Sequence, residues 1–206
     1  MSFTIVVTSH VNSGLEDEPA RWGSFFGSMA MSNLVPMSMM STLQTARLIL
    51  RPYQESDREA FVSLNCDADV RQRMDGPLSL DSADSLFSKI LAAERTGWSF
   101  SWAIVSKAGL EYIGHAFIVG GEAEDYELGY LFVSKVWGQG FGTEAVTRIV
   151  QHGFDSLGLD RLVATVDVGH ARSIRILEKT GFELEETKEE EGCPYHLYVA
   201  RRPTPL

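Results

Sequence analysis

Residues 127–154, ELGYLFVSKVWGQGFGTEAVTRIVQHGF, decide how the rest of this chain is organised. The first seven, residues 127–133, are mostly aliphatic and aromatic, which predicts a largely buried strand. After Thr143 the apolar residues recur at the i, i+3, i+4 spacing of a helix with one buried stripe, and Gly158 stands where that helix would end. Strand and helix are joined by a junction with three alternating glycines, residues 138–142, GQGFG.

This glycine junction predicts a site for an anion. Glycine adopts backbone angles that other residues avoid, and it lets a ligand approach the main chain closely. The amides at the start of a helix are unpaired and lie at the positive end of the helix dipole, so a phosphate or diphosphate is the expected ligand. A plain connecting turn is the alternative. Three alternating glycines that open a strongly amphipathic helix favour the anion site.

Two common nucleotide-binding loops do not fit the junction. The P-loop ends in Gly-Lys-Ser/Thr so that a lysine reaches the terminal phosphates, whereas Gly142 is followed directly by Thr143. The dinucleotide fingerprint spaces its glycines G-x-G-x-x-G near the start of a βαβ unit. Here the spacing is G-x-G-x-G, and the loop lies past the middle of the chain, so this match is poor.

The junction resembles the pyrophosphate loop of the GNAT superfamily, the acyl-coenzyme A N-acyltransferases, whose motif is Gln/Arg-x-x-Gly-x-Gly/Ala. Residues 137–142 fit this motif with Trp137 in the first place, and residues 136–145, VWGQGFGTEA, resemble the branch that includes the ribosomal-protein alanine acetyltransferases. Two further blocks of that branch have counterparts in the expected order. They are HARSIRILEKTGF at residues 170–182 and TARLILRP at residues 45–52. The resemblance covers about residues 42–201.

The resemblance implies an α/β (α+β) fold: a mixed, mostly antiparallel central sheet of six to seven strands, flanked by helices on both faces, with a splayed central strand pair. The local patterns agree with it. An acidic run at 188–192 is expected to be a solvated hairpin tip. Strands are expected at 46–50, 101–105, 112–119, 127–133, 161–166, 182–185 and 197–200. Helices are expected at 56–64, 80–95, 143–157 and 171–180. A Ser-x-x-Glu capping box at 56–59 would open the first of these helices.

The chain is expected to contain an N-terminal extension, residues 1–41, and a GNAT acetyltransferase domain, residues 42–206. The extension has no sustained helical or strand periodicity, and Met39 and Met40 immediately precede the first recognisable strand. One hypothesis is therefore a dispensable arm or a translation-start artefact. The alternative is that residues 3–7 add an edge strand and that three aromatic residues anchor the segment against the partner subunit of a homodimer: Trp22, Phe25 and Phe26.

Composition sets further limits. With 206 residues and 44% hydrophobic content, one substantial domain is expected. The absence of a long apolar run or a signal-peptide pattern predicts a cytoplasmic protein with no membrane partner. Cys66 and Cys193 fit reduced thiols better than a disulfide or zinc site, and no metal is expected. A net charge of −10 argues against a nucleic acid partner and would mildly favour a cationic amine.

The resemblance also implies the binding site, with acetyl-CoA as the co-substrate. Main-chain amides where the central strands part, at Leu131, Phe132 and Val133, would stabilise the oxyanion. His170 stands where the family has an asparagine that hydrogen-bonds the pantetheine arm or the loop. A histidine can make one such hydrogen bond, or it can titrate near neutral pH and transfer a proton. The alternative is that the substitution weakens the contact with the coenzyme. The coenzyme's diphosphate would be held by Gly138, Gln139, Gly140, Phe141, Gly142 and Thr143.

Two residues are candidates for proton transfer. Glu127 begins a buried strand, where desolvation would raise its pKa and suit it as a base; a solvated strand edge is the alternative. Ser173 matches a serine of the ribosomal-protein branch that would protonate the thiolate, or else it caps a helix. Leu177 occupies the place where many relatives carry a catalytic tyrosine. His115 is expected to be a packed strand residue.

These features together predict an N-acetyltransferase that moves an acetyl group from acetyl-CoA to a primary amine by direct attack on the thioester. The amine acceptor would be a protein N-terminus or a small molecule, and residues between the first strand and the helix at 80–95 would line its pocket. A non-catalytic acyl-CoA-binding or regulatory module on the same fold is the alternative, because of His170 and the missing tyrosine. A nucleotide-binding enzyme is a weaker third hypothesis.

Overall fold

The structure is a computed structural model that describes residues 41–74, 76–93, 99–120, 125–190 and 192–203. The predictions for residues 1–40, including the edge strand and the three aromatic anchors, lie outside the described residues. The elements are β1 (Leu43–Gln44), β2 (Leu48–Arg51), η4 (Glu55–Asp57), α2 (Arg58–Asn65), α3 (Leu80–Ala93), β3 (Ser99–Ser106), β4 (Tyr112–Gly120), β5 (Tyr126–Phe132), η6 (Ser134–Val136), α4 (Phe141–Asp155), β6 (Arg161–Asp167), α5 (Ala171–Lys179), β7 (Glu183–Glu190) and β8 (Cys193–Arg201).

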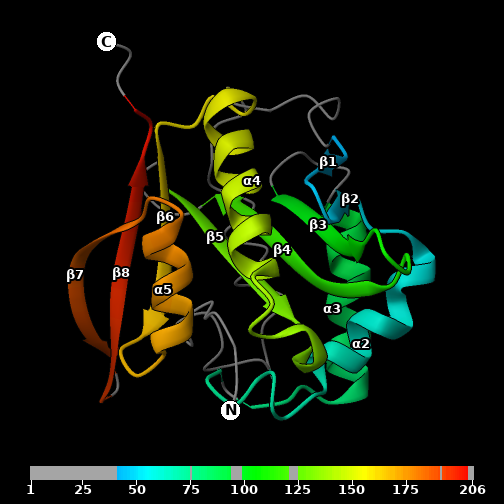
Figure 1. The fold of residues 1–206 in the computed structure, drawn as a ribbon. Coiled ribbons are helices and arrows are strands. Elements are labelled where there is room, and N and C mark those ends of the chain that lie inside the picture. Colours follow the sequence, from blue (N-terminus) through cyan, green and yellow to red (C-terminus); the bar gives the residue numbers. More distant parts are fainter. Residues whose placement is uncertain (1–40, 75, 94–98, 121–124, 191, 204–206) are drawn as a thin grey trace.

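The described strands form one sheet in the order β1-β2-β3-β4-β5-β6-β8-β7 (Figure 1). Neighbouring strands are antiparallel except for β5 and β6, which are parallel and share the single pair Glu127 and Val163. The predicted fold class and the splayed central pair are therefore confirmed. The sheet has eight strands rather than six or seven. Part of the difference is β1, whose two residues are too few to show a period in the sequence.

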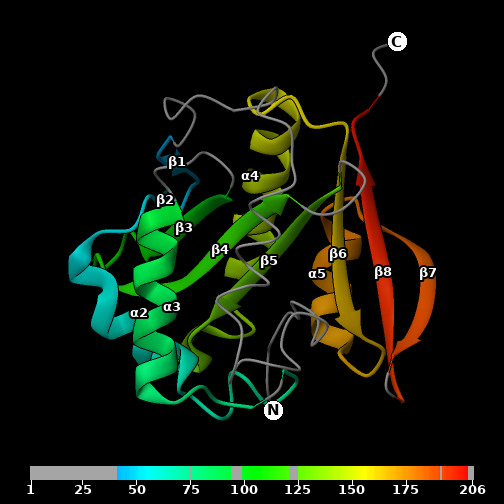
Figure 2. The same ribbon diagram turned by 180° about the vertical axis from the view of Figure 1, so that it is seen from behind.

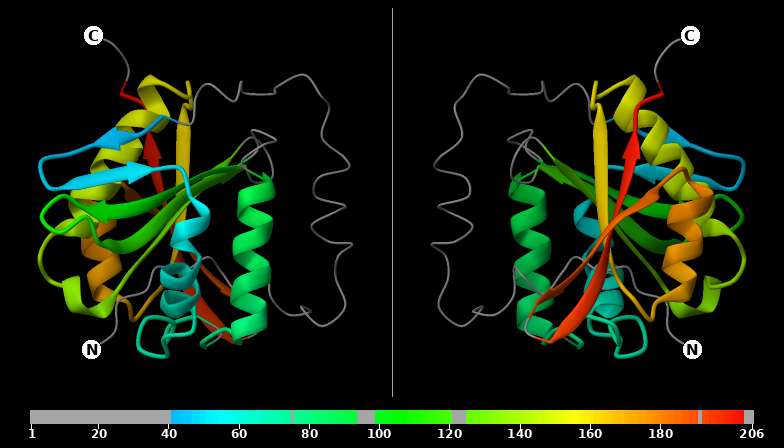
Figure 3. Two further views of the ribbon diagram at one scale, coloured as in Figure 1. Left: turned by 90° about the vertical axis from the view of Figure 1, so that its right-hand side faces the viewer. Right: turned by 90° about the vertical axis from the view of Figure 1, so that its left-hand side faces the viewer.

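Helices cover both faces of this sheet. Figure 2 and the edge-on views of Figure 3 show α2 and α3 on one side and α4 and α5 on the other. The larger core lies between the sheet and α4 and α5, and includes Trp102, Leu128, Ile149, Leu162 and Leu177. The smaller core lies under α2 and α3, where Tyr53, Phe61 and Phe87 meet edge to face or tilted. No helix in the described part of the chain is long and apolar enough to cross a membrane.

The start of the first helical segment differs from the predicted capping box at 56–59. The N-cap is Gln54, and the capping box joins Gln54 and Asp57: the Asp57 carboxylate accepts a hydrogen bond from the Gln54 N–H at 2.8 Å. Arg51 donates two further bonds to the same carboxylate, at 2.7 and 2.8 Å. Because a bidentate arginine fixes the carboxylate in place, a 3-10 turn forms at Glu55–Asp57 and the α-helix starts at Arg58.

The hairpin of β7 and β8 turns within the acidic run predicted as its tip, 188–192, but the tip is shorter than predicted. Strand β7 continues to Glu190, and Glu189 and Glu190 pair with Pro194 and Cys193 of β8. All of the side chains of β7 are exposed. Its side chains remain at the surface, so the sequence carries no apolar–polar alternation that would show the strand continuing past residue 185.

Strands β4 and β5 approach each other closely at Gly114. A Cβ atom at this position would lie 2.2 Å from the carbonyl oxygen of Leu131 and 3.0 Å from the Cα of Phe132. Both are backbone atoms, so a side chain could be accommodated only if the strands moved apart. Gly114 therefore fixes the position of β5 near its C-terminal end.

We expect Gly114→Ala to destabilise the protein by about 1–3 kcal/mol, because the added methyl group overlaps the main chain of β5. Urea unfolding would measure the change. The matched control is Gly109→Ala in the β3–β4 turn, where the new Cβ would make an ordinary contact with Glu111 at 3.4 Å. A Gly114→Ala variant within about 0.5 kcal/mol of the wild type would contradict the interpretation.

Candidate active site

The site begins where β5 and β6 separate. After Glu127 and Val163, no further pair joins the two strands within the described residues, although β5 runs on to Phe132 and β6 to Asp167. Figure 1 shows the two strands diverging towards their arrowheads. The edge of β5 that faces β6 therefore has no neighbouring strand over its last residues, and a ligand with amide groups can pair there.

The C-terminal end of β5 presents one of its amides to this open edge. The Val133 N–H donates to the Ile113 carbonyl at 3.0 Å, and the register places Leu131 opposite His115 and Phe132 opposite Gly114. Antiparallel strands bond to their partner at alternate residues, so the Phe132 N–H points away from β4. Of the three predicted oxyanion residues, Phe132 has the amide in the suitable direction.

Trp137 fixes the same end of the strand. Its indole Nε1 donates to the carbonyl of Phe132 at 2.8 Å. The sequence identified Trp137 as an unusual residue at the first position of the loop motif, but not as the group that holds β5 against the loop. A bond between side chain and main chain across a turn leaves no periodic pattern that could have revealed it.

The glycine loop lies between η6 and α4. Gly138 and Gly140 have φ angles of 75° and 80°, in the left-handed region that favours glycine, and Gly140 is the N-cap of α4. At Gly142 a Cβ would lie 2.7 Å from the side-chain tip of Ile176 on α5. The first two glycines therefore shape the loop, and the third allows α4 and α5 to approach.

The amides of this loop are not used by the protein's own main chain. In the ranges that the structure covers, no main-chain carbonyl accepts a hydrogen bond from residues 138–143. The first main-chain bond of α4 runs from the Glu144 N–H to the Gly140 carbonyl at 3.1 Å. The predicted phosphate donors are thus together at the positive end of a 15-residue helix, an arrangement that suits an anion.

Glu127 lies near the start of β5 and is half-buried. Burial raises the pKa of its carboxyl, and the opposing hydrogen bond that Thr165 Oγ1 donates to Oε1 at 2.8 Å does not cancel the effect. Strand alternation places Glu127 on the same face as Leu131, which packs against Leu64 and Val70 beneath α2. This is the face predicted to receive the amine.

Ser173 and His170 lie at the start of α5 and are both buried. His170 is the N-cap, and its N–H donates to the Asp167 carbonyl at 2.9 Å. Ser173 lies near the hydroxyl of Tyr130, which β5 directs to the face opposite Glu127, but that hydroxyl makes no hydrogen bond within the described residues. The two predicted proton-transfer residues are therefore on opposite faces of β5.

Tyr130 was not singled out from the sequence. Burial raises its pKa well above the ordinary value, although the interaction with Ser173 acts in the other direction. Its place in the alternation of Leu128, Tyr130 and Phe132 matches any core-facing strand residue, so only the spatial meeting with Ser173 distinguishes it. Leu177 is fully buried in the same core.

His115 has the environment of a packed residue. Its ring stacks on Phe61 with centroids 5.1 Å apart, and Nδ1 lies 3.3 Å from the Tyr112 hydroxyl. Burial, together with the positive charge of Arg71, lowers the pKa of His115 to about 3. The imidazole is therefore neutral across the physiological range.

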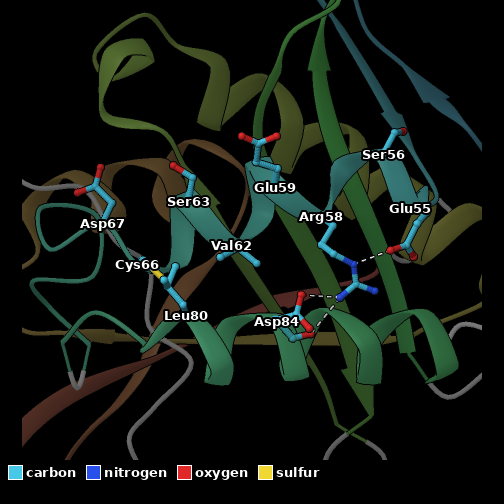
Figure 4. Close-up of a pocket in the computed structure, with 10 residues that line it drawn as sticks. All are labelled: Glu55, Ser56, Arg58, Glu59, Val62, Ser63, Cys66, Asp67, Leu80 and Asp84. Carbon is cyan, nitrogen blue, oxygen red and sulfur yellow. Dashed lines mark hydrogen bonds and ion pairs between the residues drawn. The ribbon is translucent and has the colours of Figure 1, made fainter.

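The surface holds one other depression of interest, outside this site. It lies between α2 and the start of α3, and Figure 4 shows its lining. Its residues are Glu55, Ser56, Arg58, Glu59, Val62, Ser63, Cys66, Asp67, Leu80 and Asp84. None is a predicted catalytic or coenzyme-binding residue, but those at 55–67 lie in the segment predicted to line the acceptor pocket. Over the described residues, no group of three or more histidine, cysteine, aspartate or glutamate side chains gathers in a way that could hold a metal ion.

Comparisons with known proteins agree with this architecture. The chain is 29% identical over 171 residues to YoaA of Bacillus subtilis strain 168, an uncharacterized N-acetyltransferase, covering 78% of this chain and 96% of YoaA. Spermidine N-acetyltransferase from Vibrio cholerae, solved with CoA and spermine, has a TM-score of 0.67 at 17% identity and covers 76% of this chain and 96% of that one.

A third relative is RimL, a ribosomal L7/L12 alpha-N-protein acetyltransferase solved with coenzyme A. It has a TM-score of 0.69 at 18% identity, with 78% of this chain and 98% of RimL covered. At such identities the two solved structures establish the fold alone. Residues 47–183, well over half of the chain, match the family model of the acetyltransferase (GNAT) domain. The chain therefore belongs to the GNAT family of N-acetyltransferases.

Proposed function

We propose that this protein transfers an acetyl group from acetyl-CoA to the primary amine of a protein N-terminus or of a small molecule. The observation that carries the proposal is the set of loop amides at residues 138–143, which no main-chain carbonyl in the described ranges engages. They lie directly after a strand whose facing edge is open. This combination suits a ligand with a diphosphate at one end and an amide-bearing arm at the other, as coenzyme A has.

The loop amides would bind the diphosphate, and the open edge of β5 would pair with the pantetheine arm. His170, at the start of α5, would contact the arm or the loop. These residues would bring the thioester to the point where the strands part, and the Phe132 N–H would stabilise the negative charge that develops on its carbonyl oxygen.

Two side chains would then move protons. Glu127 would accept a proton from the amine, directly or through water, which frees the nitrogen to attack the thioester carbon. A C–N bond forms and the C–S bond breaks. Ser173 would protonate the departing thiolate and would regain its own proton from solvent. The two groups act from opposite faces of β5, so neither has to leave the position in which it is held.

We also propose that the acceptor is a cationic amine, either a polyamine-like small molecule or a protein N-terminus. Solved proteins with this fold include a spermidine acetyltransferase and a ribosomal-protein acetyltransferase, and both act on amines. A net charge of −10 suits a cationic acceptor of either kind. Thiol release from acetyl-CoA, measured with a panel of polyamines and peptides, tests the proposal. Tight binding of the coenzyme without turnover on any amine would instead support the non-catalytic module.

We expect Gly140→Val to weaken coenzyme A binding about tenfold or more, equivalent to at least ~1.4 kcal/mol, because a β-branched residue cannot adopt the φ of 80° that shapes the loop. Isothermal titration calorimetry would measure the affinity. Gly158→Val is the matched control, since Gly158 has a φ of 74° just beyond the other end of α4. Equal affinity of the two variants would exclude the loop as the phosphate site.

We expect Glu127→Gln to lower kcat by about a hundredfold, the usual range for loss of a general base, and to abolish the acidic limb of the pH–rate profile. Since burial raises the pKa of Glu127, the wild-type rate should rise with pH through a value above that of an ordinary glutamate. Initial rates measured across a pH series would show both effects.

Stability provides the control for this variant. A raised folded-state pKa means that Glu127 favours folding most below its unfolded pKa, and that this contribution is lost as the pH rises through the folded value. Glu127→Gln should therefore be at least as stable as the wild type at neutral pH, so lost activity would not reflect unfolding. An unchanged rate and pH profile would show that Glu127 is not the base.

A further inference from the structure

Arg47 reaches the glycine loop from a distant part of the chain. It lies in the turn between β1 and β2, yet its Nε contacts the Glu144 carboxylate at 2.6 Å and its Nη1 donates to the Gln139 carbonyl at 2.9 Å. Its guanidinium carbon lies 4.2 Å above the centroid of the Phe141 ring. One side chain thus touches the loop, the first helical residue and the first helical turn.

The contacts of Arg47 remove two obstacles to anion binding at this loop. Glu144 places a negative charge in the first turn of α4, and the Gln139 carbonyl is the negative end of a peptide dipole inside the loop. Each would repel a phosphate held by the neighbouring amides. Arg47 forms an ion pair with the Glu144 carboxylate and donates a hydrogen bond to the Gln139 carbonyl. The loop amides can then bind the anion with less repulsion from these two groups.

Glu144 is held firmly in this arrangement. Thr45 Oγ1 donates to its Oε1 at 2.5 Å, and the main-chain N–H of Arg47 donates to the same oxygen at 2.8 Å. Burial acts to raise the pKa of Glu144, but these hydrogen bonds and the contact with the Arg47 guanidinium outweigh it and hold the pKa below its ordinary value. The carboxylate is therefore ionised at neutral pH, and its charge needs a partner.

The turn that carries Arg47 is itself anchored to the sheet. The Lys107 N–H donates to the Arg47 carbonyl at 2.9 Å, and Lys107 Nζ donates to the Thr45 carbonyl at 2.6 Å. The Leu48 N–H donates to Thr45 Oγ1 at 2.9 Å. Isolated surface ion pairs contribute little because both side chains lose freedom to form them. Here the backbone beneath the arginine is already fixed.

We propose that Arg47 is a positioning residue for the coenzyme: it orients the 138–143 loop and neutralises Glu144 so that the loop amides can hold the diphosphate. The proposal rests on the proposed function, because it concerns the same site. The first hairpin of the domain, β1 and β2, is not part of the loop motif, and the proposal gives this hairpin a role in coenzyme binding. It also predicts that Arg47 matters for that end of the coenzyme which carries phosphate, and not for the thioester.

The test compares two thioesters with full-length protein. We expect Arg47→Ala to raise the KM for acetyl-CoA about tenfold, equivalent to about 1.4 kcal/mol, with kcat within about twofold. With acetyl-pantetheine, which lacks the diphosphate and the nucleoside, the KM should be the same as in the wild type. Adding Glu144→Gln to Arg47→Ala should recover part of the lost affinity for acetyl-CoA, because the unpaired negative charge is then absent.

Arg201→Ala is the control. Arg201 also forms an ion pair with a glutamate, Glu185, but it lies on β8, in the other half of the sheet. Its loss should leave the KM for acetyl-CoA unchanged. The proposal is overturned if Arg47→Ala behaves like the control, if it raises the KM for both thioesters alike, or if Glu144→Gln recovers nothing. A wild type that does not bind acetyl-CoA would instead refute the proposed function.

Discussion

One residue pair, Glu127 with Val163, joins the two halves of the sheet, and the arrangement of the site depends on what the strands do after it. On one side β1 to β5 are antiparallel throughout, and on the other β6, β8 and β7 are antiparallel as well. The parallel pair in the middle does not continue beyond this residue pair, and β5 lies close to β4 at Gly114. The edge that is left open lies next to the loop that begins α4, so two kinds of main-chain donor meet in one place.

Local and overall charge act in opposite directions in this protein. The chain carries a net charge of −10. Its acidic residues include the exposed glutamates of β7 and Glu144 at the start of α4. The proposed diphosphate site at the loop is compatible with this net charge, because the Glu144 carboxylate is paired with Arg47 and the loop amides make no main-chain hydrogen bond within the described residues. Salt screens charges that lie farther away than a Debye length of about 10 Å, so they affect an anion at the loop less than these immediate neighbours do.

The family, the fold class and the splayed pair could be predicted because three short blocks of the sequence resemble those of the GNAT superfamily. The sequence was not sufficient where the controlling contact joins distant residues. Arg51 holds the Asp57 carboxylate of the capping box, and β7 extends past residue 185 through its pairing with β8. Neither contact leaves a trace in the local pattern.

The same distinction applies to the site. The glycines and Glu127 could be proposed from the sequence because steric freedom and strand position are local properties. The meeting of Tyr130 with Ser173, and that of Arg47 with Glu144, 97 positions apart, arise from the tertiary fold and required the structure. Which face of β5 each group occupies follows from alternation once the register is known.

The strand order has a consequence for how the protein is made. Strands β1 to β5 each pair with a neighbour in the chain, so this part can assemble as it leaves the ribosome. In contrast, β8 lies between β6 and β7, and β6 gains its antiparallel partner only after residues 193–201 have been synthesised. The hairpin that carries Arg47 and the glycine loop thus belong to the early half, whereas the segment that contains Ser173 is completed late. During translation the proposed coenzyme-binding loop would therefore be synthesised before the sheet around Ser173 is complete.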